Sequence, residues 1–192
     1  SPFDPKNRAV LIGTDVSSRY TRRGQEEYMR IAAYIKQTVM QKKGNYLAFF
    51  PSYRMLQDVM ACTGPQLDTS IRCICQTSGM TEEEREAFLH EFEQKRKEDE
   101  GLLGFCVMGG IFGEGIDLKE DSLIGAIIVG TGIPQICRER EILKQYYDGR
   151  NEDGFAYAYR YPGMNKVLQS AGRVIRTEDD RGIILLLDDR FQ

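Results

Sequence analysis

A glutamine, a glycine and two arginines recur at helical spacing near the C-terminus of this 192-residue chain. They occupy positions i, i+3, i+4 and i+7 of a predicted helix: Gln169, Gly172, Arg173 and Arg176. One face of a helix over 163–176 would therefore carry all four side chains. A glycine inside a helix costs about 1 kcal/mol relative to alanine and usually marks a close approach by a ligand or another backbone. Two guanidinium groups one turn apart suit a polyphosphate, so the pattern favours a phosphate-facing helix over surface ion pairs.

A glycine-rich segment follows the predicted strand Gly104–Met108. Its glycines, at positions 109, 110, 113 and 115, let the backbone pass close to a ligand at the carboxyl end of that strand. Glu114 and Asp117 add carboxylates that suit a ribose hydroxyl, a metal-bound water or an arginine, whereas a phosphate would repel them. The chain has no Gly-Lys-Ser/Thr, so the segment is not a Walker A loop.

A third segment places an aromatic and a basic side chain just beyond a predicted strand. The apolar run Tyr46–Phe50 stops at Pro51, and Ser52 is suitably placed to cap the next helix. Tyr53 and Arg54 would then project at the carboxyl edge of that strand.

Short apolar runs alternate with helical stretches along the whole chain. The predicted strands are Ala9–Gly13, Tyr46–Phe50, Ile71–Gln76, Gly104–Met108, Ile124–Val129 and Gly182–Leu187. The predicted helices span residues 25–43, 53–63, 81–97, 135–147 and 163–176, and Thr81 with Glu84 fits a capping box. Several strands are apolar at nearly every position, as parallel strands covered on both faces are. The alternation predicts an open α/β sheet with right-handed crossovers and ligands at the carboxyl ends of its strands.

The stretch Tyr146–Tyr161 holds five of the chain's ten tyrosines. Arg150 and Arg160 lie among them, so the stretch could stack on nucleobases, which is worth roughly 1–3 kcal/mol per base. We favour a packing role instead, in which an insertion is held against the sheet by Phe155, Tyr157, Tyr159 and Tyr161.

Composition limits the classes of protein that fit. Hydrophobic residues make up 41% and charged residues 29%, which predicts one globular domain over 1–192 with a helical and aromatic insertion around 135–161. The net charge of −3 argues against a general polyanion-binding surface but leaves room for a local basic strip. His90 is the only histidine, which excludes Ser-His, Cys-His and multi-histidine zinc sites within the chain. The five cysteines form no Cys-x-x-Cys and predict reduced structural thiols, so we expect no metal site.

Targeting signals are missing from the sequence. No apolar run reaches the roughly 18 residues of a membrane-spanning helix, and the first residues lack the apolar core of a signal peptide. We therefore expect a cytoplasmic protein without a membrane partner. The chain begins with Ser1 and not with methionine, which we interpret as a sign that it was cut from a longer polypeptide.

Together, these segments resemble motifs IV, V and VI of the XPD/DinG family of superfamily 2 DNA helicases. The resemblance is carried by Phe-Phe-Pro-Ser-Tyr (49–53), Gly-Glu-Gly-Ile-Asp (113–117), Gln-x-x-Gly-Arg-x-x-Arg (169–176) and Leu-Leu-Asp-Asp-Arg-Phe (186–191). It covers essentially the whole chain and implies the family's second motor domain. The expected fold is then RecA-like: α/β, with an open, mainly parallel β-sheet and helices on both faces.

The resemblance implies an ATP site shared between two domains. Arg173 and Arg176 would act as arginine fingers on ATP and Mg²⁺ held by the first RecA-like domain of the same polypeptide, contacts that can be worth 10³–10⁵ in rate. Gln169, together with Gly172, would couple the helix to the nucleotide. Gly115 and Asp117 would lie near the nucleotide sugar, with Glu114 bracing their loop.

The resemblance also implies a DNA partner, single-stranded or forked, and translocation in the 5′→3′ direction. Tyr53 and Arg54 would face single-stranded DNA, and Arg22 and Arg23 would touch DNA phosphates. The Walker A loop, the Asp-Glu-Ala-His box and any iron–sulfur cluster would belong to the first half of the helicase, so this chain alone is expected to be inactive.

Two other classes remain open from the residues alone. A non-catalytic α/β module that binds nucleic acid would use the basic and aromatic contacts without the Gln/Gly/Arg/Arg array. An enzyme that binds a nucleotide-sugar or a dinucleotide would use the glycine-rich segment and hold its ligand without a second domain.

Overall fold

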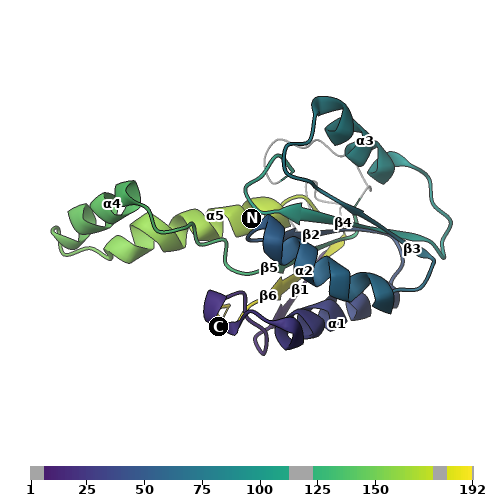
Figure 1. The fold of residues 1–192 in the computed structure, drawn as a ribbon, viewed down its shortest axis with the longest axis horizontal. Coiled ribbons are helices and arrows are strands. Elements are labelled where there is room, and N and C mark those ends of the chain that lie inside the picture. The colour runs from purple at the N-terminus through teal and green to yellow at the C-terminus, as the bar shows by residue number, and fades with distance from the viewer. Residues whose placement is uncertain (1–6, 113–122, 175–180, 192) are drawn as a thin grey trace.

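The computed structural model describes residues 7–112, 123–174 and 181–191, which form one six-stranded sheet flanked by helices (Figure 1). All strands are parallel, in the order β1-β6-β5-β2-β4-β3. The strands are β1 (Arg8–Gly13), β2 (Asn45–Phe50), β3 (Ile71–Cys75), β4 (Gly101–Val107), β5 (Gly125–Val129) and β6 (Gly182–Leu187). The helices are η2 (Tyr20–Arg22), α1 (Gln25–Gln41), α2 (Tyr53–Thr63), η3 (Gly64–Gln66), α3 (Glu82–Glu93), α4 (Arg138–Asp148), η4 (Ala156–Arg160) and α5 (Tyr161–Ala171). The predicted parallel α/β sheet is confirmed.

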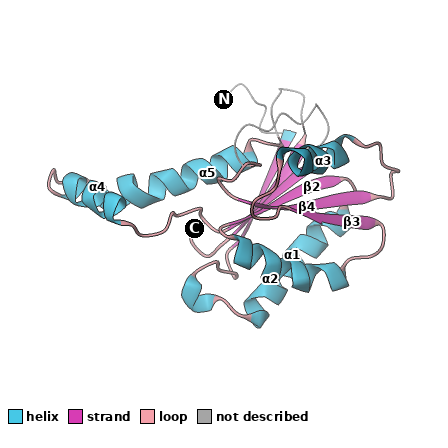
Figure 2. Ribbon diagram, turned by 45° about the horizontal axis from the view of Figure 1, so that its top comes forward, coloured by secondary structure: helices cyan, strands magenta, loops and turns pink. Residues whose placement is uncertain are grey.

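Helices cover both faces of the sheet (Figure 2). α1 and α2 pack on one face, and α3 and α5 pack on the other. Neighbouring residues of β2 serve the two cores in turn, because Phe50 packs with α1 and α2 whereas Phe49 packs on the opposite side. Burial on both faces explains why the central strands are apolar at successive positions.

Side-chain caps fix the start of two helices as predicted. The Ser52 hydroxyl accepts a hydrogen bond from the backbone N–H of Met55 at 3.4 Å. At α3, Glu84 N donates to Thr81 Oγ1 at 3.2 Å while the Glu84 carboxylate accepts from Thr81 N at 2.9 Å. The predicted capping box is therefore present.

The predicted helix over 163–176 is wrong at its C-terminal end. α5 ends at Ala171, Gly172 is its C-cap, and the backbone then tightens into a turn in which Val174 N bonds to Ala171 O at 3.2 Å. The turn brings Val174 into the core, directly over Gly182, where any side chain would collide with it. The glycine therefore ends the helix instead of interrupting it, and Arg173 does not continue the helical face.

The tyrosine-rich stretch is part of a two-helix arm that projects from the sheet with α4 at its far end (Figure 1). The chain is helical from residue 154, and the π-helix η4 leads directly into α5. The rings of Tyr157 and Tyr147 stack at 4.0 Å, and Tyr159 Oη donates to the Glu141 carboxylate at 2.6 Å. The predicted packing of Tyr157 and Tyr159 against the sheet is therefore wrong, because these side chains bind η4 to α4.

No helix in the described ranges is long and apolar enough to cross a membrane. All five cysteines are free thiols.

The end of β6 is anchored to the segment that leaves β1. Asp188 is fully buried and accepts hydrogen bonds from Ser18 N and Oγ at 2.9 and 2.7 Å. Arg190 donates to the same carboxylate through Nε at 2.6 Å and Nη2 at 3.0 Å. Burial raises the pKa of Asp188, but the hydrogen bonds from Arg190 and Ser18 outweigh it and hold that pKa well below its usual value. Arg190 and the segment after β1 thus share one carboxylate.

Removing this charge should destabilise the fold in a pH-dependent way. We expect Asp188→Asn to lower the free energy of unfolding by roughly 3 kcal/mol near pH 7, because Arg190 loses its counter-charge. The folded carboxyl has a depressed pKa, so its contribution is fully present above the unfolded pKa of about 4 and fades as pH falls towards the folded pKa. Urea unfolding of the wild type and the variant, near pH 7 and near pH 3, measures the effect.

The matched control is Asp189→Asn, which removes a more exposed carboxylate that pairs with Arg19 at 3.2 Å and with Arg190 only at 3.9 Å, and leaves Arg190 its contact with Asp188 at 2.6 Å. Its cost should stay below about 1 kcal/mol. A cost of Asp188→Asn that is the same at both pH values would show that the charge is not the anchor.

Candidate functional site

The predicted DNA-facing residues lie at the carboxyl edge of the sheet. Tyr53 and Arg54 open α2 directly after β2, where the Ser52 cap fixes the start of the helix. Arg22 and Arg23 lie in the segment that follows β1. Because the strands are parallel, the connections that leave them emerge at one edge, and the structure brings these residues to that same edge.

Arg173 lies at the opposite, amino edge. α5 runs back along the sheet, so the turn that holds Gly172 and Arg173 lies beside the start of β6, where the neighbouring Val174 packs on Gly182. Gln169 is exposed in the last turn of the same helix. The structure therefore brings these three residues together, although not on one helical face. Four predicted site residues lie outside the described ranges: Arg176, Glu114, Gly115 and Asp117.

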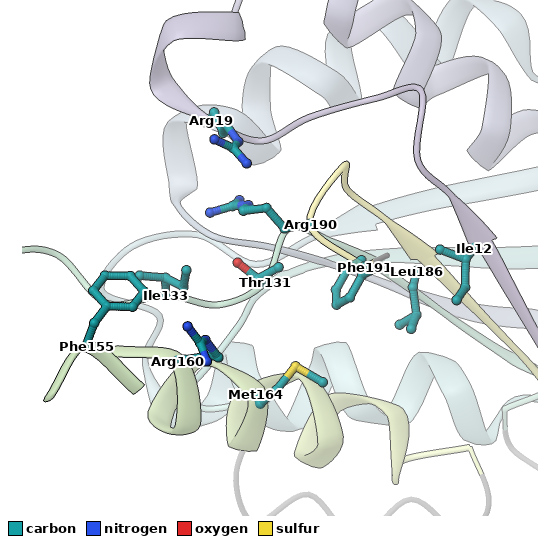
Figure 3. Close-up of a pocket in the computed structure, with 10 residues that line it drawn as sticks. All are labelled: Ile12, Arg19, Thr131, Ile133, Phe155, Arg160, Met164, Leu186, Arg190 and Phe191. Atoms are coloured by element: carbon teal, nitrogen blue, oxygen red, sulfur yellow. The ribbon is translucent and has the colours of Figure 1, made fainter. Parts of the chain in front are cut away.

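A pocket of about 690 Å³ opens at the carboxyl edge, between the arm and the ends of β1 and β6 (Figure 3). Its sheet side is apolar, with Ile12, Leu186 and Phe191. Phe155 and Arg160 line it from the arm. The pocket thus combines an apolar wall with an exposed aromatic ring.

Three arginines reach this pocket, and each is oriented by a carboxylate. Besides Arg190 on Asp188, Arg19 Nε lies 3.2 Å from Asp189 and Arg160 Nη1 lies 3.3 Å from Asp153. The hydrogen bond to Asp188 raises the pKa of Arg190, so that guanidinium stays charged.

Arg160 also has an aromatic partner in the pocket. Its guanidinium carbon lies 5.9 Å from the centre of the Phe155 ring, within the range of a cation–π contact. Apolar and aromatic walls with cationic groups beside them suit a flat base attached to a phosphate.

The basic residues predicted from the sequence differ in how far they are engaged. Arg22 Nη2 lies 3.3 Å from the buried carboxylate of Glu27, and Arg23 Nε donates to Ser18 O at 3.2 Å, so both help to fix the segment after β1. The Arg54 side chain is 89% exposed, and its ion pair with the carboxylate of Asp58 is long, at 4.0 Å. Arg54 is therefore the more accessible contact for a phosphate.

The beginning of the glycine-rich segment is described as far as Phe112. Gly109 has φ +66°, a conformation that favours glycine, and a Cβ there would lie 3.0 Å from Cε of Lys166 on α5. Phe112 is fully buried, and its ring stacks on Phe88 of α3 at 4.3 Å. The segment thus leaves the carboxyl edge and turns onto the face covered by α3 and α5. No group of three or more potential metal ligands occurs within the described ranges.

The sequence analysis missed Arg190 and Gln76 as candidate functional residues. Arg190 directly follows an aspartate pair at the end of a predicted strand, and Gln76 closes another predicted strand. Their position at carboxyl ends of parallel strands was the signal that could have identified them.

Comparison with known proteins agrees with this geometry. Residues 35–192 match the helicase C-terminal domain family. The ATP-dependent DNA helicase XPD of Sulfolobus acidocaldarius is 28% identical over 191 residues, covering 94% of this chain and 31% of the relative. The regulator of telomere elongation helicase 1 homolog of Drosophila melanogaster is 28% identical over 201 residues, covering 95% of this chain and 20% of the relative.

The fold is similar to that of a solved XPD helicase, with a TM-score of 0.76 at 26% identity over 96% of this chain and 32% of that one. The chain therefore spans about a third or less of the length of these relatives. From the family match and the six-stranded parallel sheet, the chain belongs to the helicase C-terminal domain family, as the RecA-like C-terminal domain of an XPD/DinG-type superfamily 2 helicase.

Proposed function

We propose that this chain is the second motor domain of an ATP-dependent DNA helicase that moves 5′→3′ along a single strand. The observation that carries the proposal is the path of one helical run, from Gly154 through η4 and α5 to Ala171. At 1.5 Å per residue the run is roughly 27 Å long. Phe155 and Arg160 near its first end line the pocket, and Arg173 lies two residues beyond its last residue. A displacement of this helical run would move contacts at both edges of the sheet.

The Arg173 end faces nucleotide in this proposal. Arg173, with Arg176 three residues on, would enter the triphosphate site of the first motor domain, which also supplies Mg²⁺ and any iron–sulfur cluster. A guanidinium near the γ-phosphate stabilises the charge that spreads over its oxygens during transfer. Gln169 and Gly172 would set the approach of this end to the nucleotide. Gly115 and Asp117 would lie near the nucleotide sugar, and Glu114 would brace their loop.

The pocket end faces single-stranded DNA. A base would stack on Phe155 while neighbouring phosphates meet Arg19, Arg160 and Arg190. Tyr53 and Arg54 extend the same edge along the sheet, and Arg22 and Arg23 border it from the segment after β1. Closure of the two motor domains on ATP and their reopening would then shift the strand.

Arg173→Ala in the full-length helicase separates a motor from a passive module. We expect DNA-stimulated ATP hydrolysis to fall by about 10³-fold or more, as expected for loss of an arginine finger, while affinity for oligothymidine changes less than about twofold. Arg176→Ala should behave in the same way. Steady-state ATPase assays and fluorescence anisotropy supply the two measurements.

Arg30→Ala is the control for Arg173, because Arg30 pairs with Glu26 on the surface of α1. It should leave both quantities unchanged. Retained hydrolysis with lost DNA binding in Arg173→Ala would instead support a non-catalytic nucleic-acid-binding module.

Phe155→Ala tests the pocket. Loss of one stacked base costs roughly 1–3 kcal/mol, so we expect oligothymidine to bind the full-length helicase about 5- to 150-fold more weakly. Phe155→Trp should restore affinity, because it returns an aromatic face. The readout is the dissociation constant without nucleotide.

Tyr146→Ala is the matched control, because Tyr146 is an exposed aromatic on α4 that meets Tyr147 edge to face and does not line the pocket. It should bind as the wild type does. If Tyr146→Ala weakens binding and Phe155→Ala does not, the strand follows the far end of the arm and the pocket has another role.

A further inference from the structure

Gln76 is a buried polar residue directly beneath the proposed DNA-facing edge. Its side chain is 3% exposed, and it follows the last residue of β3. Both halves of its carboxamide are engaged: Nε2 donates to Tyr53 Oη at 2.9 Å, and Oε1 accepts from Val107 N at 2.9 Å. One amide therefore joins the start of α2 to the end of β4.

The bond to Val107 replaces a bond of the sheet. Gln76 N donates to Phe105 O at 2.8 Å, as the next step of a parallel ladder requires. A regular ladder would then pair Val107 N with the backbone carbonyl of Gln76, but Val107 N donates to the Gln76 side chain instead. The end of β4 thus fixes the orientation of the carboxamide, and in this orientation its amino group points towards Tyr53.

In the hydrogen bond with Tyr53, the Gln76 amino group is therefore the donor and the Tyr53 hydroxyl oxygen is the acceptor. Because Gln76 donates to the phenol oxygen, the phenolic hydrogen is not used in this bond and remains available to an acceptor. The acceptor that fits is a phosphate oxygen, since the α2 N-terminus favours negative charge and the exposed Arg54 stands beside it.

We infer that Gln76 is a positioning residue that directs the Tyr53 hydroxyl towards a phosphate oxygen of the bound strand, an inference that rests on the proposed function. The same amide links this contact to the glycine-rich segment, because a Cβ at Gly110 would lie 3.2 Å from Gln76 Nε2. Gly110 therefore packs closely on the amide that holds Tyr53, and a larger side chain at this position would press on that amide.

The test uses the full-length helicase with four variants: Gln76→Leu, Gln76→Glu, Tyr53→Phe and the double variant Gln76→Leu/Tyr53→Phe. Gln76→Leu and Tyr53→Phe should each weaken oligothymidine binding by roughly threefold to tenfold, the effect of one hydrogen bond. The affinity of the double variant for oligothymidine should equal that of the single variant that binds more weakly, because both changes remove the same contact.

Gln76→Glu keeps an acceptor for Val107 but reverses the second bond. An ionised carboxylate accepts the phenolic hydrogen and takes it away from the strand, so binding should weaken at least as much as in Gln76→Leu. This variant also keeps the test informative if Gln76→Leu unfolds through its unsatisfied Val107 N–H.

ATPase titrations with DNA distinguish positioning from general damage. In Gln76→Leu the DNA concentration for half-maximal stimulation should rise threefold to tenfold, whereas the rate at saturating DNA changes less than about twofold. Gln37→Leu, an exposed glutamine on α1, is the matched control and should match the wild type in both.

Additive losses in the double variant would overturn the inference, as would normal binding by both Gln76 variants while Tyr53→Phe binds weakly. Either result leaves the proposed function intact. If the wild-type helicase itself shows neither binding to oligothymidine nor stimulation by it, the proposed function fails instead.

Discussion

All six strands run in the same direction, and this constraint decides where each functional side chain can lie. Every connection that leaves a strand starts at the carboxyl edge and must cross a face of the sheet before the next strand begins. Residues just after strands therefore gather at one edge, as Tyr53, Gln76 and Arg190 do. Residues at the ends of the crossover helices gather at the other edge, and Arg173 is one of them, because the neighbouring Val174 packs on Gly182 at the start of β6. Two kinds of ligand can thus be kept apart on a single small domain.

The same constraint gives the helical run over 154–171 its importance. A crossover helix in a parallel sheet necessarily reaches from one edge to the other, and the π-helical turn at η4 extends this one beyond the sheet into the arm. Val167 packs it into the core while Lys166 lies against the glycine-rich segment. The helical run is therefore held by the core at Val167, in its second half, and carries candidate ligand contacts towards both ends, an arrangement suited to passing a small displacement across the domain.

Apolar periodicity was sufficient to predict the strands, because burial on both faces leaves little choice of residue in strands such as β2 and β5. The start of α3 was equally predictable, since the Thr81 and Glu84 capping box is a local interaction. The end of α5 was not, because it depends on Val174 meeting Gly182, a contact between segments that the helical pattern does not record. The predicted packing of Tyr157 and Tyr159 against the sheet was wrong for a related reason. Aromatic residues indicate burial but not the element they pack against, which here is α4.

The candidate site was predicted in part. Motif spacing predicted Tyr53, Arg54 and Arg173 as site residues, and the edge at which each of them lies depends on the local chain direction. It could not locate Gln76 or the pocket, because these depend on which strands are neighbours: β3 pairs with β4, and β1 pairs with β6. A single sequence contains the strand ends but not the order in which the sheet places them, so residues brought together by strand order are visible only in the fold.

The ion pairs around the pocket bear on how a chain of net charge −3 could hold a polyanion and still move along it. Arg19, Arg160 and Arg190 each face a carboxylate, so the local positive potential is largely balanced. Those carboxylates fix the guanidinium groups in place and reduce the entropy lost on binding. They also limit the counterion-release contribution that makes basic clefts bind nucleic acid tightly. Affinity would then depend more on stacking and on aimed hydrogen bonds, which form and break one nucleotide at a time. Under the proposed function the strand is released in every cycle, and a pocket with balanced charge would allow this release without separating a large block of opposite charges.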